Sequence, residues 1–423
     1  MSRTFESLKV RNFRIFSAGN LLSNVGTWMQ RVAQDWLVLV VAGSAGALAI
    51  TTGLQFLPTL LLSPIAGVVA DRFPKRIVVL VAQIAMALCA LALGLLALAG
   101  VVETWHIYLL SFLFGCGSAF DVPARQAFVN EMVDRDRLPN AIALNSASFN
   151  LARMIGPAVA GLLISALGSG VRATGWVILA NAASYVAVLI SILLLRRSEL
   201  IPTAPLHSSR GQLATGLRYV RSRPDIMLVM AVVFCAGTFG LNFQMTTALM
   251  ATRVYAKGAG EYGILGSLIA VGSLAGSLAA ARRRASRQRL VIVSAAIFGL
   301  TEVVAGLMPS FLTYAIALPF CGVAALTAIT AANAFVQMTS APEVRGRVMA
   351  LYMMIFMGGT PFGSPLLGWI ADQWGARWTV IGGGALTTIG TLAAALLLSR
   401  RQGVSVVASW DAGPRLHIDR ATR

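Results

Sequence analysis

Long apolar segments separated by short polar turns run along almost the whole chain. The apolar blocks lie at 14–41, 48–70, 77–100, 106–129, 140–167, 174–195, 225–251, 262–281, 289–308, 311–337, 346–371 and 377–398. Each is long enough to cross a bilayer, whose hydrocarbon core takes about 20 residues of helix. Because lipid offers the backbone no hydrogen-bonding partner, each block should be helical. The pattern predicts an all-α membrane protein with twelve transmembrane helices.

A more polar stretch divides these blocks into two sets of six. The expected organisation is an N-terminal six-helix bundle at 1–195, a central loop at 196–224, a second bundle at 225–400 and a tail at 401–423. Within the loop, residues 209–222 place Leu213, Leu217 and Val220 on one face and arginines on the other. This segment is either an amphipathic helix on the inner leaflet or a flexible basic linker.

The two halves also resemble each other in sequence. Ala127-Phe128-Val129 recurs as Ala334-Phe335-Val336, and three glycines recur at the same offset. The run from Gly67 to Asp71 is echoed by the run from Gly368 to Asp372. Repeats of this kind are typical of secondary transporters, which bind substrate near the midplane between pseudo-symmetric halves.

Basic residues are distributed unevenly between the two sides of the predicted membrane. Of 34 Lys and Arg residues, only Arg172, Arg253, Lys257 and Arg377 fall in loops on the side away from the N-terminus. Loops rich in Lys and Arg stay in the cytoplasm, so both termini should lie there and the chain should be a multi-pass protein of the bacterial inner membrane. The net charge of +18 then reflects topology, and no nucleic-acid partner is expected.

The composition excludes several other classes of protein. With 57% apolar and 12% charged residues, the chain leaves no room for the sizeable soluble domain of a receptor. Its four cysteines and three histidines are scattered, so neither a metal site nor a disulfide framework is expected. The phosphate-binding loop of an ATPase and the H-E-x-x-H motif of a metalloprotease do not occur in the sequence. No cofactor and no enzyme activity are expected.

One face of the first predicted helix is polar along most of its length. Ser17, Asn20, Asn24, Thr27, Arg31 and Gln34 follow one another at steps of three and four, which places them on one side of a helix. Weaker polar stripes occur on the fourth, seventh and tenth helices. Together they predict a central aqueous cavity with the candidate lining residues Asn20, Asn24, Thr27, Gln34, Arg153, Asn242 and Asn333. Hydrogen-bonded packing between helices is the alternative for any single position.

Carboxylates inside the predicted helices are candidates for carrying a proton. Asp35 lies one helical turn from Arg31. Burial favours the neutral acid, whereas a nearby arginine favours the carboxylate, so movement of Arg31 could load or release a proton. A permanent structural ion pair is the alternative. Asp121 with Arg125 is the second candidate and Glu302 the third.

The turn between the second and third helices resembles a signature of the major facilitator superfamily. The run Gly67-Val-Val-Ala-Asp71-Arg72-Phe-Pro-Lys75-Arg76 is similar to G-x-x-x-D-R-x-G-R-[RK], with Pro74 in place of a glycine. Its charged residues suggest a conformational latch formed by Gly67, Asp71, Arg72, Lys75 and Arg76, which must break in every cycle. Exposed salt bridges contribute only about 0–1 kcal/mol, which suits such a latch.

The fifth helix carries a second resemblance. Arg153-Met-Ile-Gly156-Pro157-Ala-Val-Ala-Gly161 is similar to the glycine-proline signature of the antiporter branch. Small residues permit close helix approach and proline permits bending, so Gly156, Pro157 and Gly161 are the expected hinge.

Further motifs resemble one bacterial subgroup, the transmembrane secretion effectors, which include enterobactin-type siderophore exporters and macrolide efflux proteins. They are Gly26-Thr-Trp28-Met-Gln30, Asp121-Val-Pro-Ala-Arg125-Gln126-Ala-Phe128 and Leu144-Asn145-Ser-Ala-Ser-Phe-Asn150. The resemblance implies export of a drug, siderophore or other organic small molecule by proton antiport with alternating access. Its expected partners are the substrate, protons and the lipid bilayer, and it should act as a monomer. Import of a sugar or organic acid on the same fold is the alternative.

Overall fold

The computed structural model describes residues 3–201, 212–281, 287–401, 404–409 and 415–420, and these are almost entirely helical. The N-terminal bundle consists of α1 (Arg11–Ala42), α2 (Ala45–Arg72), α3 (Lys75–Ala99), α4 (Thr104–Asn130), α5 (Leu138–Ala166) and α6 (Val171–Leu193). The C-terminal bundle consists of α8 (Pro224–Cys235), α9 (Phe243–Leu249), α10 (Ala259–Ala281), α11 (Gln288–Gly306), α12 (Phe311–Thr339), α13 (Arg345–Gly358), α14 (Thr360–Trp374) and α15 (Ala376–Arg401). The predicted all-α membrane fold is confirmed.

Two of the expected helices are interrupted. The seventh changes from α8 to a π-helical turn at Ala236–Gly240, leaves helical geometry at Leu241 and Asn242, and resumes as α9 before a second π-helical turn at Met250–Val254. The eleventh is divided between α13 and α14, where Pro361 stands in the first turn of α14. Interruptions of this kind expose backbone groups at membrane depth, which is tolerated where they face protein or a cavity.

Eleven helical segments within the described residues are long and apolar enough to cross a membrane, and α1 is not among them. Its 32 residues are ample in length, but its polar face lowers the mean hydropathy of the helix. Asn20, Asn24, Gln30, Gln34 and Asp35 on α1 are all buried. The polar face of α1 is therefore packed against protein, while Leu22 and Val40 on the same helix are exposed.

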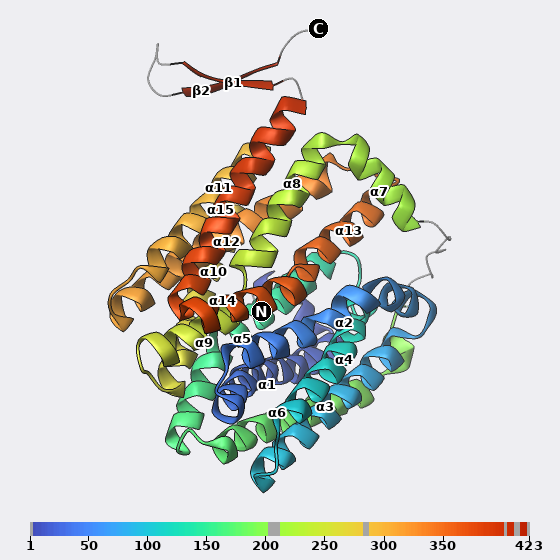
Figure 1. Cartoon of the computed structure of the whole chain (residues 1–423). Coiled ribbons are helices and arrows are strands. Elements are labelled where there is room, and N and C mark those ends of the chain that lie inside the picture. Colours follow the sequence, from blue (N-terminus) through green and yellow to red (C-terminus); the bar gives the residue numbers. More distant parts are fainter. Residues whose placement is uncertain (1–2, 202–211, 282–286, 402–403, 410–414, 421–423) are drawn as a thin grey trace.

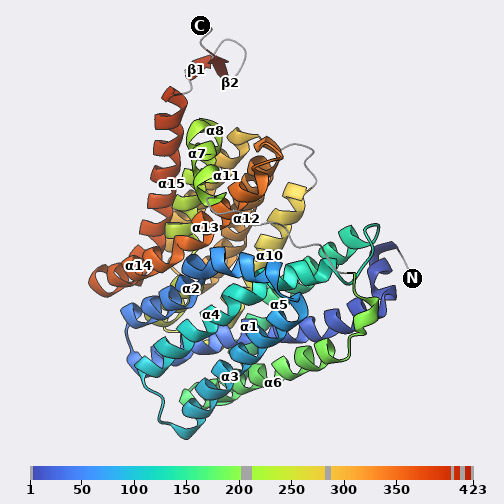
Figure 2. The same cartoon turned by 90° about the vertical axis from the view of Figure 1, so that its right-hand side faces the viewer.

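The bundles touch each other along α5 and α10 and along α2 and α14, and they diverge from this contact (Figures 1 and 2). We call the end that carries the start of α1 and the α2–α3 turn the proximal end. The end with the α1–α2 turn is the distal end. Small residues allow the contact: a Cβ on Gly263 of α10 would strike the Pro157 carbonyl of α5, and one on Gly368 of α14 would strike Ala49 of α2. Without a hydrophobic force between helices in lipid, such close packing drives association.

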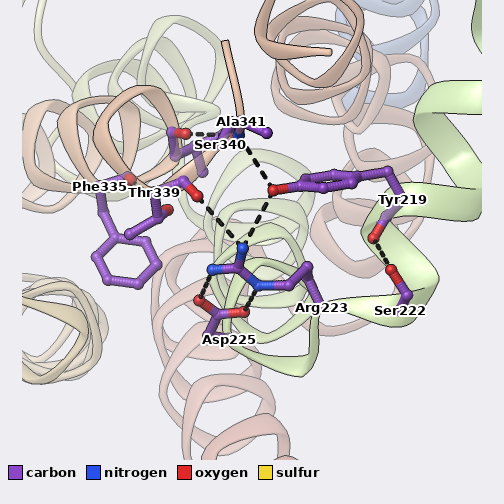
Figure 3. A network of polar contacts seen from close by, with 9 residues as sticks. Tyr219, Ser222, Arg223, Asp225, Phe335, Thr339, Ser340 and Ala341 are labelled. Carbon is purple, nitrogen blue, oxygen red and sulfur yellow. Dashed lines mark hydrogen bonds and ion pairs between the residues drawn. The ribbon is translucent and has the colours of Figure 1, made fainter. Parts of the chain in front are cut away.

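The helix α7 (Gln212–Ser222) corresponds to the predicted amphipathic segment, of which residues 209–211 lie outside the described part. Figure 3 shows how its end is attached to the C-terminal bundle. Arg223 binds both carboxylate oxygens of Asp225, at 3.0 and 2.7 Å, and donates to the Tyr219 hydroxyl at 3.1 Å. The same hydroxyl accepts the Ala341 N–H at 3.1 Å, at the end of α12. These contacts tie the segment to one bundle and disfavour a flexible linker.

Beyond α15 the chain forms an antiparallel hairpin, which the sequence did not predict within the expected tail. The strand β1 (Val404–Ser409) pairs with β2 (Arg415–Arg420), with Val404 opposite Arg420.

Candidate functional site

A partly open cavity of about 270 Å³ lies between the two bundles. Its wall comes from α1, α2 and α5 on one side and from α9, α10, α12 and α13 on the other. Of the predicted lining residues, Arg153 and Asn242 face it. Asn242 stands at the interruption of the seventh helix, where its side chain accepts from Ser364 at 2.8 Å and donates to the Thr238 carbonyl at 2.8 Å. The interruption thus places a polar group in the wall.

Arg31 of α1 lines this cavity and also a smaller one of about 60 Å³ within the N-terminal bundle. Its guanidinium carbon lies 4.8 Å from the centre of the Trp28 ring and 5.4 Å from that of Phe56. Both distances are within the range of cation–π attraction. The smaller cavity also contacts Asn24 and Thr27, so two further predicted lining residues face space, but a different one.

Asp35 does not form the expected ion pair with Arg31 in the described structure. Instead, its Oδ2 accepts the Tyr262 hydroxyl of α10 at 2.7 Å, and both residues are almost fully buried. The spacing of Arg31 and Asp35 permits a pair, but the tyrosine reaches the carboxylate from the other bundle. Asp35 therefore links the two bundles directly beside the cavity.

Asp121 and Arg125 form the predicted pair within α4. Gln83 of α3 donates to Asp121 at 2.8 Å, and Arg125 donates to Asn20 and Asn24 of α1 at 2.7 and 3.1 Å. Every contact of this network stays inside the N-terminal bundle. Because Asn20 also donates to Asn145 of α5 at 3.1 Å, the network joins four helices of one bundle.

Three other predicted residues lie away from both cavities. Gln34 donates to Ser111 of α4 at 3.0 Å, and Asn333 on α12 is half-buried. Glu302 lies against Gly240 in the core of the C-terminal bundle. It is 3% exposed, and its Oε2 has no hydrogen-bond partner among the described residues.

The proposed latch residues of the α2–α3 turn fall into two groups. Lys75 pairs with Glu131 at 3.4 Å, and Arg76 donates to the Ile192 and Leu193 carbonyls at the end of α6. These contacts stabilise the N-terminal bundle itself. Asp71 and Arg72 make no ion pair with any described residue, and no described atom lies near the space that a Cβ on Gly67 would occupy. The part of the motif that could reach the other bundle is therefore not engaged.

The glycine-proline run of α5 forms two contact surfaces. A Cβ on Gly156 would lie 2.6 Å from the Trp28 side chain of α1, whereas Pro157 and Gly161 pack on α10. In addition, the Ala158 N–H donates to the Ser267 hydroxyl of α10 at 3.2 Å. The run brings the helices of both bundles close together at the distal side of the cavity.

A charged contact joins the two bundles at the distal end, and the sequence did not predict it. Arg253 pairs with Asp372 at 2.9 Å and donates to the Gly43 carbonyl at 3.0 Å. Asp372 also accepts the N–H groups of Ala45 and Gly46, at 3.2 and 2.8 Å, at the start of α2. Two features of the sequence could have pointed to this contact. Asp372 ends the run that repeats Gly67–Asp71, and Arg253 is one of only four basic residues in the loops on the distal side.

Comparisons with known proteins agree with this architecture. Residues 2–420 match the family model described as transmembrane secretion effector. The multidrug efflux pump Tap of Mycolicibacterium fortuitum is 28% identical, with 85% of this chain and 89% of the pump covered. The staphyloferrin A transporter of Staphylococcus aureus is 24% identical (86% and 90% covered), and macrolide efflux protein A of Streptococcus pyogenes is 22% identical (90% and 94% covered).

Solved structures show the same fold. A bacterial homologue of the human lysosomal transporter Spinster superposes with a TM-score of 0.74 at 16% identity, covering 95% of this chain and 98% of that one. A D-xylose–proton symporter superposes with a TM-score of 0.72 at 12% identity, covering 90% and 96%.

Proposed function

The chain belongs to the transmembrane secretion effector family, and from that premise we propose that it exports an organic small molecule from the bacterial cytoplasm in exchange for protons. The family and the fold make it a multi-pass membrane transporter of small molecules. The direction of transport, the coupling to protons and the residues that carry out both are what we propose. Efflux pumps and a siderophore transporter among its relatives favour export.

The observation that carries the proposal is the cavity shared by the two bundles, together with the hydrogen bonds that join the bundles at the distal end, from Arg253 to Gly43 and from Ala45 and Gly46 to Asp372. Alternating access requires a site between two halves that opens to one side at a time. The distribution of Lys and Arg favours a cytoplasmic proximal end. On that assignment, both termini are cytoplasmic, and this conformation is the one that would receive cargo from the cytoplasm.

The proposed moving units are the segments 1–195 and 225–400, joined by 196–224, within one functional monomer. The inter-bundle contact along Pro157 and Gly161 is the proposed pivot, with Gly156 packed on α1. Asp71 and Arg72 are the proposed closing contact at the proximal end, and Lys75 and Arg76 keep their turn in place.

Asp35 is the strongest candidate for the coupling carboxylate. A charge-assisted hydrogen bond such as the one from Tyr262 is roughly twice as strong as a neutral one. Protonation of Asp35 would therefore weaken a direct link between the bundles and bias the equilibrium between conformations. Arg31, one turn away, would act on Asp35 through its charge. Asp121 and Glu302 rank lower because neither touches the other bundle or the main cavity.

The test uses inverted membrane vesicles energised to an acidic interior, with uptake of a panel of fluorescent drugs as the readout. The Asp35→Asn variant should lose proton-driven uptake while retaining expression and a monodisperse elution profile. Asp134→Asn, which removes an exposed carboxylate on the α4–α5 turn, is the matched control. Undiminished uptake in Asp35→Asn would remove Asp35 from the coupling mechanism, and uptake only in the opposite direction in counterflow would favour the importer.

A further inference from the structure

Two arginines in the wall of the main cavity have no carboxylate partner among the described residues. Arg31 and Arg153 both line the cavity, and neither forms an ion pair with a described Asp or Glu. The Nε atom of Arg31 is fully buried and has no hydrogen-bond partner there. Buried arginines are normally paired because an isolated charge in a membrane interior is costly. An unpaired couple of like charges calls for a compensating anion.

Asp35 lies one turn from Arg31 and interacts with it through its charge, but no nearby carboxylate forms an ion pair with either arginine in the described structure. Asp35 accepts its hydrogen bond from Tyr262 and does not form part of the cavity wall, and Asp121 is paired with Arg125. Glu302 lies in the core of the C-terminal bundle. No Asp or Glu is among the described residues that line the main cavity, so its formal charge comes from the two arginines alone.

The rest of the wall suits an apolar, ring-containing body. Trp28 and Phe56 flank the Arg31 guanidinium, and Phe243, Tyr262 and Phe356 face the same space from the C-terminal bundle. Aromatic side chains pack well against flat ligand rings. A guanidinium binds a carboxylate or a similar oxyanion through two parallel hydrogen bonds. The volume of about 270 Å³ is close to the lower limit for small-molecule sites.

We infer that the cargo of this cavity is an organic anion, in which an oxyanion group binds Arg31 and Arg153 while an apolar ring system lies against the aromatic wall. The inference rests on the proposed transport function and specifies its substrate class. Arg31 is on α1 and Arg153 on α5, both in the N-terminal bundle, whereas most of the aromatic wall belongs to the C-terminal bundle. The anion and the ring system of one ligand would thus contact different bundles.

Two dyes with the same tricyclic xanthene core test the inference. Fluorescein is an anion at pH 8 and rhodamine 123 is a cation. Fluorescence polarisation with the purified full-length protein in nanodiscs should show at least tenfold tighter binding of fluorescein. The Arg31→Gln and Arg153→Gln variants should each weaken fluorescein binding about tenfold or more, and neither should weaken rhodamine 123 binding.

The control variant Arg172→Gln removes an exposed arginine at the start of α6 and should bind fluorescein as the wild type does. Arg31→Lys and Arg153→Lys keep the charge and should retain more binding than the glutamine variants, which separates loss of the anion site from misfolding. Equal or tighter binding of rhodamine 123, no fluorescein binding to the wild type, or full binding by both glutamine variants would overturn the inference. Because equilibrium binding needs no proton gradient, a protein that binds fluorescein but moves nothing in vesicles would contradict only the proposed function.

Discussion

The two ends of the molecule carry the same short motif in opposite states. At the distal end, Gly368 lets α14 approach α2, and Asp372 binds Arg253 and the first N–H groups of α2. At the proximal end, Gly67 faces open space, and Asp71 contacts no cation among the described residues. A glycine followed four residues later by an aspartate is therefore not sufficient for a closed contact. The helix start that receives the aspartate must also be within reach.

The difference has a simple electrostatic basis. The first N–H groups of a helix lack intrahelical partners and carry partial positive charge. Asp372 satisfies two such groups of α2 from the other bundle. The equivalent donors at the proximal end would be the N–H groups at the start of α13, where a Cβ on Gly346 would meet no described atom within 4 Å. Closing that gap is the step that would exchange the roles of the two ends.

The largest effect is expected from filling the space that the distal glycine leaves. Gly368→Val should force α14 away from Ala45 and Ala49, and overpacking typically costs about 1–3 kcal/mol. That corresponds to a shift of roughly 5–150-fold between conformations. Spin labels on the α3–α4 and α11–α12 turns would report the distal separation by double electron–electron resonance. Gly67→Val is the matched variant at the open end and should leave the distal contact intact. Similar shifts toward distal opening in both variants would refute the comparison.

An intermediate effect is expected from removing the charge of each aspartate. Asp372→Asn removes the charge of a side chain that is about a third exposed and accepts two N–H groups of α2 across the bundles. We therefore expect a loss of about 1 kcal/mol, or roughly fivefold, toward distal opening. Asp71→Asn should leave the distal contact intact and, if Asp71 closes the proximal end in the other state, shift the population the opposite way. The same pair of labels measures both. Shifts of equal sign would mean that the two motifs do not act as alternatives.

The smallest effect is expected from Arg253→Lys. Lysine retains the charge opposite Asp372 but not the planar fork that also reaches the Gly43 carbonyl. Loss of one neutral acceptor at a site about a third exposed predicts a shift of about two- to threefold. An effect as large as that of Asp372→Asn would indicate that the Gly43 contact, rather than the hydrogen bonds from α2 to Asp372, holds the end closed.

Sequence patterns were sufficient for the helices but not for most contacts between them. The apolar blocks match the helices closely, because length and polarity are local properties. The polar face of α1 was also recognised, and Asn24, Thr27 and Arg31 face cavities. Whether Asp35 pairs with Arg31 or Tyr262 depends on α10, far along the chain. The same applies to Gln34, whose partner Ser111 lies on α4.

A single sequence also could not predict which end of the molecule is closed. The proximal and distal motifs look alike in the chain, and only the packing of α2 on α14 shows which one is closed. Trp28, Phe56 and Phe243 could not be separated from lipid-facing aromatics by periodicity. Their role in the wall follows from the crossing of two bundles.

The main-chain character of the Asp372 contact has a consequence for reading relatives of this chain. Ala45 and Gly46 offer only their amide groups, so the interaction selects small residues other than proline at these two places and requires no particular side chain. Correlated substitution between α2 and α14 would then be weak, although the two positions touch. Methods that infer contacts from covariation in alignments would tend to overlook the contact of Asp372 with α2. A substitution at the aspartate position would be enough to change the strength of this contact in a relative.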